Sequence, residues 1–290
     1  MVLDFKMNNL RILHDNAIDR AVLTASSQAG GLGPANLQRD NRSAVLRAEG
    51  TGVAIIATWP TAELIACVAP IRTNMNSSAR MRVRGLALPG DVVPVLDTGW
   101  IMPCAEAPLG ESPFGYLPLG WNGYRWGGVN TWARGGGSDG VVWFEPVGVR
   151  QLIVELHSVD NPDGYIEISR LVAGMYWAPE YNASYGASLA LVDTSEGYRT
   201  VAGEAKSNVG TRHRVLNINL EFLTPADRAR LARIVDECGT VRPLLFSLFP
   251  ENADPVLEQQ HMLYGRVANI EAITAPSFDI YSAPLQIEGY

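Results

Sequence analysis

Short segments in which apolar and polar residues alternate constrain the fold of this chain more than any other feature. In RMRVRGL (80–86), Met81 and Val83 alternate with three arginines, and RHRVLNINLEFL (212–223) alternates over a longer run. A period of two is typical of a strand with one buried face. Further strand-like segments lie at 53–59, 63–70, 141–146, 149–156, 165–177, 243–249, 262–272 and 284–289. Closely spaced strands with few helical periods predict a mainly β chain built on an antiparallel sandwich.

In the 212–223 segment, the alternation predicts that four apolar residues share one face: Leu216, Ile218, Leu220 and Phe222. A helix is predicted directly afterwards, over 225–238. Thr224 is a natural N-cap, Pro225 suits the first helical position, and Gly239 closes the C-terminus. The apolar side of this helix consists of Leu231, Ile234, Val235 and Cys238. We expect one helix to cover a β-sheet in the C-terminal part of the chain.

The segment 87–140 is rich in Gly, Pro and Trp and follows neither period. A stretch of this length without regular elements is often functional or interfacial. It holds four aromatic residues within a dozen positions: Trp121, Tyr124, Trp126 and Trp132. These are candidate ligand-binding residues, because aromatic rings suit both sugars and protein interfaces. The alternative is a cluster that packs locally and folds the insertion onto the sandwich.

Charge and cysteine content exclude several classes of function. The chain has 290 residues and a net charge of −7, which argues against a nucleic-acid partner, since phosphate binding needs a basic surface. Its three cysteines are widely spaced and suit a reducing cytoplasm without disulfides. The N-terminal sequence lacks the features of a signal peptide. No apolar run approaches the ~20 residues that span a bilayer, so no membrane insertion is expected.

No motif for catalysis or metal binding is found. The sequence lacks the GxSxG and HExxH patterns, and its four histidines are dispersed. His157, with Asp160 and Asp163, could form an acid–base set, but NPDG is also strong turn chemistry. Carboxylates for glycoside cleavage exist, but their separation cannot be read from the sequence. We therefore expect neither an enzyme nor a metal site, and we keep a glycan-active enzyme as a third, weaker alternative.

The segments PANLQRDNRSAVLRAEG (34–50), VAIIATW (53–59) and DGYIEISRLVAG (163–174) resemble a discoidin-type, galactose-binding-like β-sandwich. The resemblance covers roughly 35–175, interrupted by the Gly/Trp-rich insertion. One departure is that the family often has Trp where Leu46 stands. The resemblance implies a jelly-roll sandwich that opens with the loop 36–42. In the family a structural calcium can sit near this corner, so Asp40 and Asn41 are candidate ligand-binding residues. The alternative is that Asn36, Asp40 and Asn41 only stabilise a turn.

A second resemblance extends over most of 165–270. RLVAGMYWAPEYNASYGASLALVDTSEGYRT, GTRHRVLNINLEFLTPADRARLARIV and RPLLFSLFPENADP are similar to tail-tip and distal tail proteins of siphovirus-type bacteriophages. It implies an N-terminal segment, 1–34, that packs with a belt-like β domain at 178–290, and a sandwich at 35–177 between them.

This second resemblance also implies a function. The chain is expected to be a structural ring protein of the virion tail, made in the host bacterial cytoplasm, with other phage tail proteins as partners. The residues expected at its interfaces are Leu216, Ile218, Arg228 and Arg233. The alternative is a carbohydrate- or host-receptor-binding module on the same tail tip, with a host surface glycan as its ligand. No cofactor is expected beyond the calcium considered above.

Overall fold

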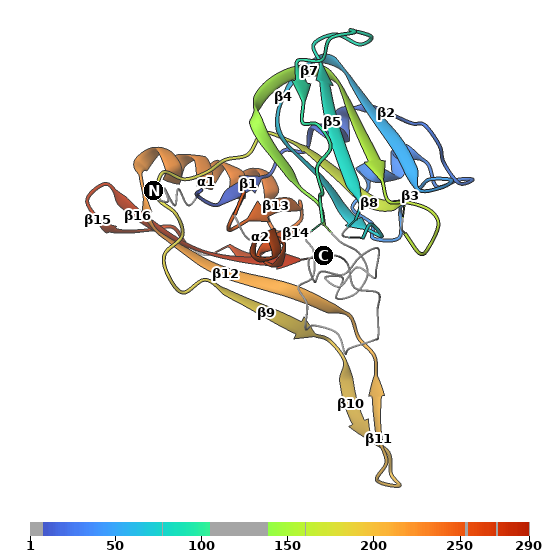
Figure 1. Cartoon of the computed structure of the whole chain (residues 1–290). Coiled ribbons are helices and arrows are strands. Elements are labelled where there is room, and N and C mark those ends of the chain that lie inside the picture. The colour runs from blue at the N-terminus through green and yellow to red at the C-terminus, as the bar shows by residue number, and fades with distance from the viewer. Residues whose placement is uncertain are drawn as a thin grey trace, which may run out of the picture. The chain divides into compact units, whose positions relative to one another are not determined.

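The structure is a computed structural model that describes residues 8–76, 78–104, 139–159, 161–252, 255–270 and 272–289. These residues form two compact units. Unit 1 comprises Asn8, Ile12–Trp177 and Phe249–Gln260, and unit 2 comprises Asn9–Arg11, Ala178–Leu248 and the chain from His261 on. Both units are built on antiparallel sheets (Figure 1), so the expectation of a mainly β fold is confirmed. No helix among the described residues is long and apolar enough to cross a membrane.

Unit 1 is built on one curled, seven-stranded sheet. Its strands run in the order β3-β8-β4-β7-β5-β6, and β2 pairs with β4. Their bounds are β2 Val22–Ala25, β3 Leu46–Arg47, β4 Gly52–Thr73, β5 Arg80–Leu86, β6 Leu96–Asp97, β7 Val142–His157 and β8 Glu167–Gly174. The short helix α2, Pro255–Gln260, also belongs to this unit.

The long strand β4 joins two segments that the sequence predicts as separate strands, 53–59 and 63–70. Its pairing with β7 shifts register between Thr58 and Glu63, so the strand continues through an irregularity. Before this point its residues alternate between buried and half-buried, and from Ile65 to Ile71 nearly all of them are buried. The first part of β4 therefore has one covered face, and the later part is covered on both faces.

The core of unit 1 is closed by two 3₁₀ turns, η1 (Ala17–Arg20) and η2 (Pro34–Gln38). Trp59 is fully buried, and its indole Nε1 donates to the carbonyl of Ala17 over 2.8 Å. A buried indole N–H needs such a partner, so this bond fixes η1 on the sheet. Through η1 and β2, residues 17–25 pack on the sheet of unit 1, whereas the preceding strand, Arg11–Leu13, pairs with Leu244–Ser247 in the sheet of unit 2. The segment 1–34, which the sequence predicts to pack with the C-terminal domain, is therefore divided between the two sheets.

Unit 2 contains a second antiparallel sheet, in the order β1-β13-β14-β16-β12-β9, with β15 on β16. The bounds are β1 Arg11–Leu13, β9 Ser188–Asp193, β12 Arg212–Leu223, β13 Leu244–Ser247, β14 Met262–Ile270, β15 Thr274–Ser277 and β16 Ile280–Gly289. Strands β10 (Glu196–Arg199) and β11 (Ala205–Asn208) form a separate two-stranded ribbon between β9 and β12. Figure 1 shows this ribbon extending away from the sheet of unit 2.

The helix α1, Pro225–Cys238, has the bounds that the sequence predicts. The hydroxyl of Thr224 accepts from the backbone N–H of Asp227, and Gly239 follows the helix with a positive φ of 53°, which glycine adopts readily. Leu231, Ile234 and Cys238 are buried, and the helix contacts β12, β14 and β16. The predicted covering helix is confirmed.

The predicted apolar face of β12 is wrong at its C-terminal end. Leu216, Ile218 and Leu220 are buried, but Phe222 is exposed and Leu223 is buried instead. The pairing of β12 with β16 shifts register between Leu220 and Leu223. A bulge adds a residue to one strand, so the side chains after it change faces.

Candidate functional site

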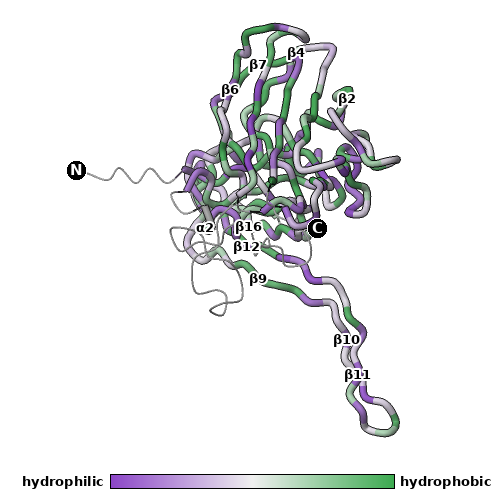
Figure 2. Tube along the Cα trace, turned by 45° about the vertical axis from the view of Figure 1, so that its right-hand side comes forward, coloured by the Kyte–Doolittle hydropathy of each residue, from purple (hydrophilic) through white to green (hydrophobic). Residues whose placement is uncertain are grey.

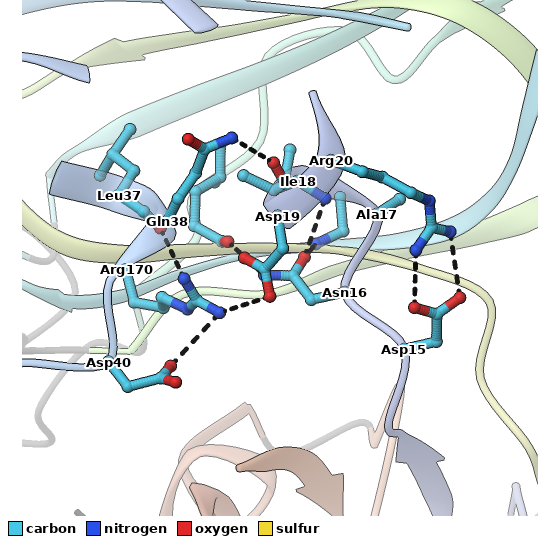
Figure 3. Close-up of polar contacts among 12 residues, drawn as sticks. Asp15, Asn16, Ala17, Ile18, Asp19, Arg20, Leu37, Gln38, Asp40 and Arg170 are labelled. Carbon is cyan, nitrogen blue, oxygen red and sulfur yellow. Dashed lines mark hydrogen bonds and ion pairs between the residues drawn. The ribbon is translucent and has the colours of Figure 1, made fainter. Parts of the chain in front are cut away.

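The loop that follows η2 holds the predicted ligand-binding residues Asp40 and Asn41, and it is anchored by a buried arginine. The side chain of Arg170, on β8, is only 5% exposed. Its guanidinium pairs with Asp19 at 2.8 Å and with Asp40 at 3.3 Å, and it donates to the carbonyl of Leu37 at 3.2 Å (Figure 3). Charge-assisted bonds of this kind are among the stronger ones in proteins. Arg170 therefore joins η1, η2 and the loop after η2 to the sheet.

The remaining polar side chains of this loop make local contacts. The Oδ1 of Asn41 accepts from the backbone N–H of Ser43 at 3.1 Å and from its hydroxyl at 2.9 Å. The amide of Asn36 donates to the carbonyl of Val45 at 2.8 Å. The Asn41 contacts are those of an Asx-type turn, and the Asn36 bond ties the two ends of the loop together. The geometry therefore favours the turn-stabilising interpretation of Asn36, Asp40 and Asn41 over the ligand-binding one.

A positive charge is already present where the family resemblance implies a calcium ion. The guanidinium of Arg170 lies between Asp19 and Asp40, and a cation placed there would be repelled by it. The described residues contain no group of three His, Cys, Asp or Glu side chains suited to holding a metal ion. Partial burial raises the pKa of Asp19 above its ordinary value, and Arg170 acts in the opposite direction. This corner is therefore an anchor for the loop.

A different part of unit 1 offers side chains to solvent. At one end of the curled sheet β4 and β5 begin and β7 ends, since Gly52 and Arg80 are both register partners of His157. Trp100 lies beside them, 45% exposed, with its ring centroid 5.0 Å from that of His157 and an interplanar angle of 73°. Edge-to-face packing holds an indole ring in place while leaving part of it open to solvent. Of the tryptophans in the described residues, Trp100 alone is classed as exposed.

A polar cluster lies at the same end of the sheet. The guanidinium of Arg47 lies 4.5 Å from the centroid of the Tyr165 ring and donates to Glu167 at 2.8 and 2.6 Å. The side-chain amide of Asn74 donates to Asp163 at 2.8 Å and to the carbonyl of Tyr165 at 3.0 Å. These bonds hold the aromatic ring of Tyr165 and its polar neighbours in fixed positions.

Backbone bonds connect this cluster to the Trp100 region. Ile166 donates to the carbonyl of Gly50 at 3.2 Å, and Ser158 donates to that of Thr51 at 2.8 Å. The side chains at these strand ends therefore belong to one region of unit 1. We call the following set the strand-end surface: Arg47, Arg80, Trp100, His157 and Tyr165.

Four of the predicted ligand-binding residues, Trp121, Tyr124, Trp126 and Trp132, lie outside the described residues. The structure does describe the start of the same segment, where Trp100 stands. Trp100 is not among the predicted site residues, although its position in the Gly/Trp-rich segment could have indicated it. Arg170 is not among them either, although it is the one charged residue in the apolar run ISRLVAG, where a buried charge requires a partner.

The residues predicted at interfaces are placed differently from one another. Leu216 and Ile218 are buried inside unit 2, so their side chains are not presented to a neighbouring chain. Arg228 lies over the ring of Tyr281 at 5.0 Å, and Arg233 pairs with Glu237 along the helix at 2.9 Å. Both arginines are exposed. The apolar–polar alternation in β12 identifies Leu216 and Ile218 as buried residues. Buried side chains are not available for contact with a neighbouring chain.

The acid–base alternative centred on His157 receives no support from the described residues. Asp163 accepts from Asn74, and the imidazole of His157 packs against Trp100. Asp160 lies outside the described residues. The contacts of His157 and Asp163 therefore hold the strand end and the following turn in place.

The sequence matches no protein-family model and none of the curated proteins. Solved structures do resemble the chain. One is chitosan-binding module 1 from a chitosanase/glucanase of Paenibacillus sp. IK-5, with 12% identity, a TM-score of 0.34, and coverage of 56% of this chain and 100% of that one. Another is the family 32 carbohydrate-binding module of C. perfringens NanJ in complex with galactose, with 10% identity and a TM-score of 0.34. The match covers 58% of this chain and 99% of that module. A Ruminococcus gnavus GH29 fucosidase is similar at 12% identity and a TM-score of 0.37, with coverage of 57% of this chain and 27% of the fucosidase.

Proposed function

We propose that this protein is a non-catalytic carbohydrate-binding protein, and that the sugar lies on the strand-end surface of unit 1. One observation carries the proposal: Trp100 presents a fixed, exposed indole at the end of a sheet whose neighbouring side chains are polar. Sugars combine apolar C–H faces with hydroxyl groups, so they suit an aromatic ring with polar groups beside it.

The polar side chains around Trp100 match the second requirement of a sugar. Arg80 and His157 are exposed at the adjoining strand ends, and Arg47 is held by Glu167 and the Tyr165 ring. Guanidinium and imidazole groups can form hydrogen bonds with hydroxyl oxygens. Because Trp100 packs on His157 and Arg47 is held by Glu167 and Tyr165, these groups need little ordering when a ligand binds.

A glycan array followed by calorimetry tests this proposal, with galactose and chitosan oligosaccharides as the first probes. Trp100→Ala should weaken binding by about tenfold or more, which corresponds to about 1.4 kcal/mol. Tyr185→Ala is the matched control, because it removes a fully exposed aromatic ring from unit 2. Failure of the purified chain to bind any glycan, or unchanged affinity in Trp100→Ala, would refute the proposal.

A second candidate function is a structural component of a bacteriophage tail tip that assembles with copies of itself in the virion tail. One observation favours an assembly role: nearly every residue of the β10–β11 ribbon is exposed, so this ribbon has no core of its own. An isolated two-stranded hairpin is marginally stable in water, and contact with other chains would stabilise it.

Electron microscopy of the purified chain tests the assembly role. Ring-shaped particles that disappear when residues 196–208 are replaced by a short turn would support it. Particles that persist after this replacement would argue against the ribbon as the assembling element.

A further inference from the structure

Three arginines on β5 point away from the core of unit 1. Arg80, Arg82 and Arg84 alternate with Met81 and Val83, whose side chains are fully buried. Since successive side chains of a strand point to opposite faces, the three arginines share the outer face of the sheet. Figure 2 shows hydrophilic and hydrophobic residues interspersed along the neighbouring strand β7 as well. The outer face of β5 therefore carries a row of guanidinium groups.

Two of these arginines already have a carboxylate partner. Arg82 donates to Asp97 at 2.9 and 2.5 Å, and Arg84 pairs with Glu155 on β7 at 3.0 Å. Each of these pairs is neutral as a whole. Arg80 is exposed, and within the part of the chain that the structure describes it has no ion-pair partner. The outer face at the start of β5 therefore keeps a positive charge that no carboxylate compensates.

This unpaired guanidinium belongs to the same patch of surface as the exposed ring of Trp100. Arg80 is the register partner of His157, and the ring of His157 packs on Trp100 with 5.0 Å between the centroids. On the other side of β5, the backbones of Met81 and Ile101 exchange hydrogen bonds of 2.8 and 2.9 Å, which hold Trp100 beside the strand. A charged group and an aromatic ring therefore border one patch.

The imidazole of His157 is fixed in position within this patch. A Cβ on Gly52 would lie 3.0 Å from Nδ1 of His157, so the ring packs against the backbone of β4 as well as against Trp100. Glycine in a strand allows such a close approach. Because the rings are already held, a ligand that contacts them loses little free energy to ordering.

Two carboxylates at this end of the sheet are engaged in hydrogen bonds. Asp163 accepts from Asn74, and Glu167 accepts from Arg47. Glu49, in the turn before β4, is exposed to solvent, where its charge is screened. The whole chain carries a net charge of −7, so its overall field repels an anion. An anion that binds here must therefore gain its affinity from direct contact with a guanidinium.

We infer that the strand-end surface selects acidic sugars, and that Arg80 binds the carboxylate of a uronic acid whose ring lies on Trp100. This inference rests on the proposed carbohydrate site and names its ligand class. A guanidinium group matches a carboxylate with two parallel, charge-assisted hydrogen bonds. The indole contacts the apolar C–H face of the same sugar. A neutral sugar keeps the ring contact and lacks the charged one.

Oligogalacturonides and their methyl esters test the inference on the full chain, because esterification removes the charge of the carboxylate and keeps the sugar. Calorimetry should show that the acidic form binds about tenfold or more tightly than its ester. Chitosan oligosaccharides should bind more weakly than the acidic form, because their protonated amino groups are repelled by the guanidinium of Arg80.

Variants test the role of Arg80 through the ratio of the two affinities. Arg80→Gln should reduce the preference for the acid over the ester to about one. Arg80→Lys keeps the charge and loses the planar fork, so it should retain part of the preference. Arg230→Gln is the matched control, because it removes an exposed arginine from unit 2 and changes the net charge by the same amount. This control should keep the full preference.

The outcomes separate this inference from the proposed function. Equal affinity for the acid and the ester, a preference that Arg80→Gln leaves intact, or a preference that Arg230→Gln also abolishes would overturn the inference, and the sugar site would stand. If neither acidic nor neutral glycans bind, the proposed site fails and the inference fails with it. A preference that is lost in Arg80→Gln and kept in Arg230→Gln would support both.

Discussion

Arg170 is a buried charged side chain that holds three segments of unit 1 together. Its partners Asp19 and Asp40 come from η1 and from the loop after η2, which are far from β8 in the sequence. Gln38 adds to the same corner by donating to the carbonyls of Ile18 and Ala21, both at 2.8 Å (Figure 3). The polar loop was predictable from its composition. Its anchor was not, because Arg170 lies about 130 residues further along the chain.

Arg170→Met should destabilise unit 1 by about 2–3 kcal/mol. The substitution removes charge-assisted bonds, but Asp19 and Asp40 are half exposed and regain water, so the loss stays below that of a fully buried pair. Urea denaturation followed by tryptophan fluorescence measures the change. Arg233→Met serves as the control, because it breaks an exposed pair within α1 and should cost below about 0.5 kcal/mol. Equal effects of the two variants would contradict the anchoring role.

Asp97 makes stability depend on pH in the acid range. Hydrogen bonds from Arg82 and from the backbone of Gly99 lower the pKa of this carboxyl from 3.8 to about 2. The folded state thus binds the proton less tightly than the unfolded state, so the stabilisation is complete above pH 3.8 and is lost as the pH falls towards 2. Asp97→Asn should be less stable than the wild type near neutral pH, by below about 1 kcal/mol, because the pair is partly exposed.

The difference in unfolding free energy between the wild type and Asp97→Asn, followed from pH 7 to pH 2 by urea denaturation, checks this prediction. The difference should shrink as Asp97 becomes protonated. The raised pKa of Asp19 acts in the opposite sense, but it is common to both proteins and cancels in the difference. A difference that is constant with pH would contradict the assignment.

Several strands have the bounds that alternation predicts, and others are longer. Strands β5 and β12 match the predicted segments 80–86 and 212–223. Strand β7 unites two predicted strands, 141–146 and 149–156, into one. Within β5, Gly85 lies opposite Leu152 on β7, and Val149 packs where a side chain on Gly85 would lie.

Gly85→Ala should destabilise unit 1 by about 1–3 kcal/mol. The added Cβ would lie 2.6 Å from Cγ1 of Val149, so either β5 or that side chain must move. Gly148→Ala is the matched control, since it also lies in a strand of this sheet and its Cβ would meet nothing within 4 Å. Thermal unfolding of both variants measures the effect. A Gly85→Ala protein as stable as Gly148→Ala would show that the close approach is easily relieved.

The whole molecule consists of two units that each bury an apolar core. Unit 1 packs its sheet around residues such as Trp59 and Met81, and unit 2 packs Ile234 of α1 against its own sheet. The resemblance to distal tail proteins implies a sandwich at 35–177 and a separate β domain at 178–290. The packing of η1 and β2 on the sheet of unit 1 was not predicted, because β2 pairs with β4 across about 30 residues of intervening chain.

Calorimetry should resolve two unfolding transitions, because units with separate cores often unfold separately. Ile234→Ala removes a buried side chain of unit 2 and should lower one transition, by about 2–5 kcal/mol. Gly85→Ala should lower the other. A single transition that both variants shift equally would show that the two units unfold together.

Local chemistry allowed the helix 225–238, the strand segments and the turn character of the loop at 36–42 to be predicted from the sequence. Each depends on neighbours within a few residues: a cap, a period of two or an Asx turn. The buried position of Arg170, the bulge that exposes Phe222, the exposed ring of Trp100 and the position of Arg80 beside His157 could not be predicted in this way. Each depends on which distant segment packs or pairs there, and strand pairing and burial are long-range properties that local periodicity does not encode.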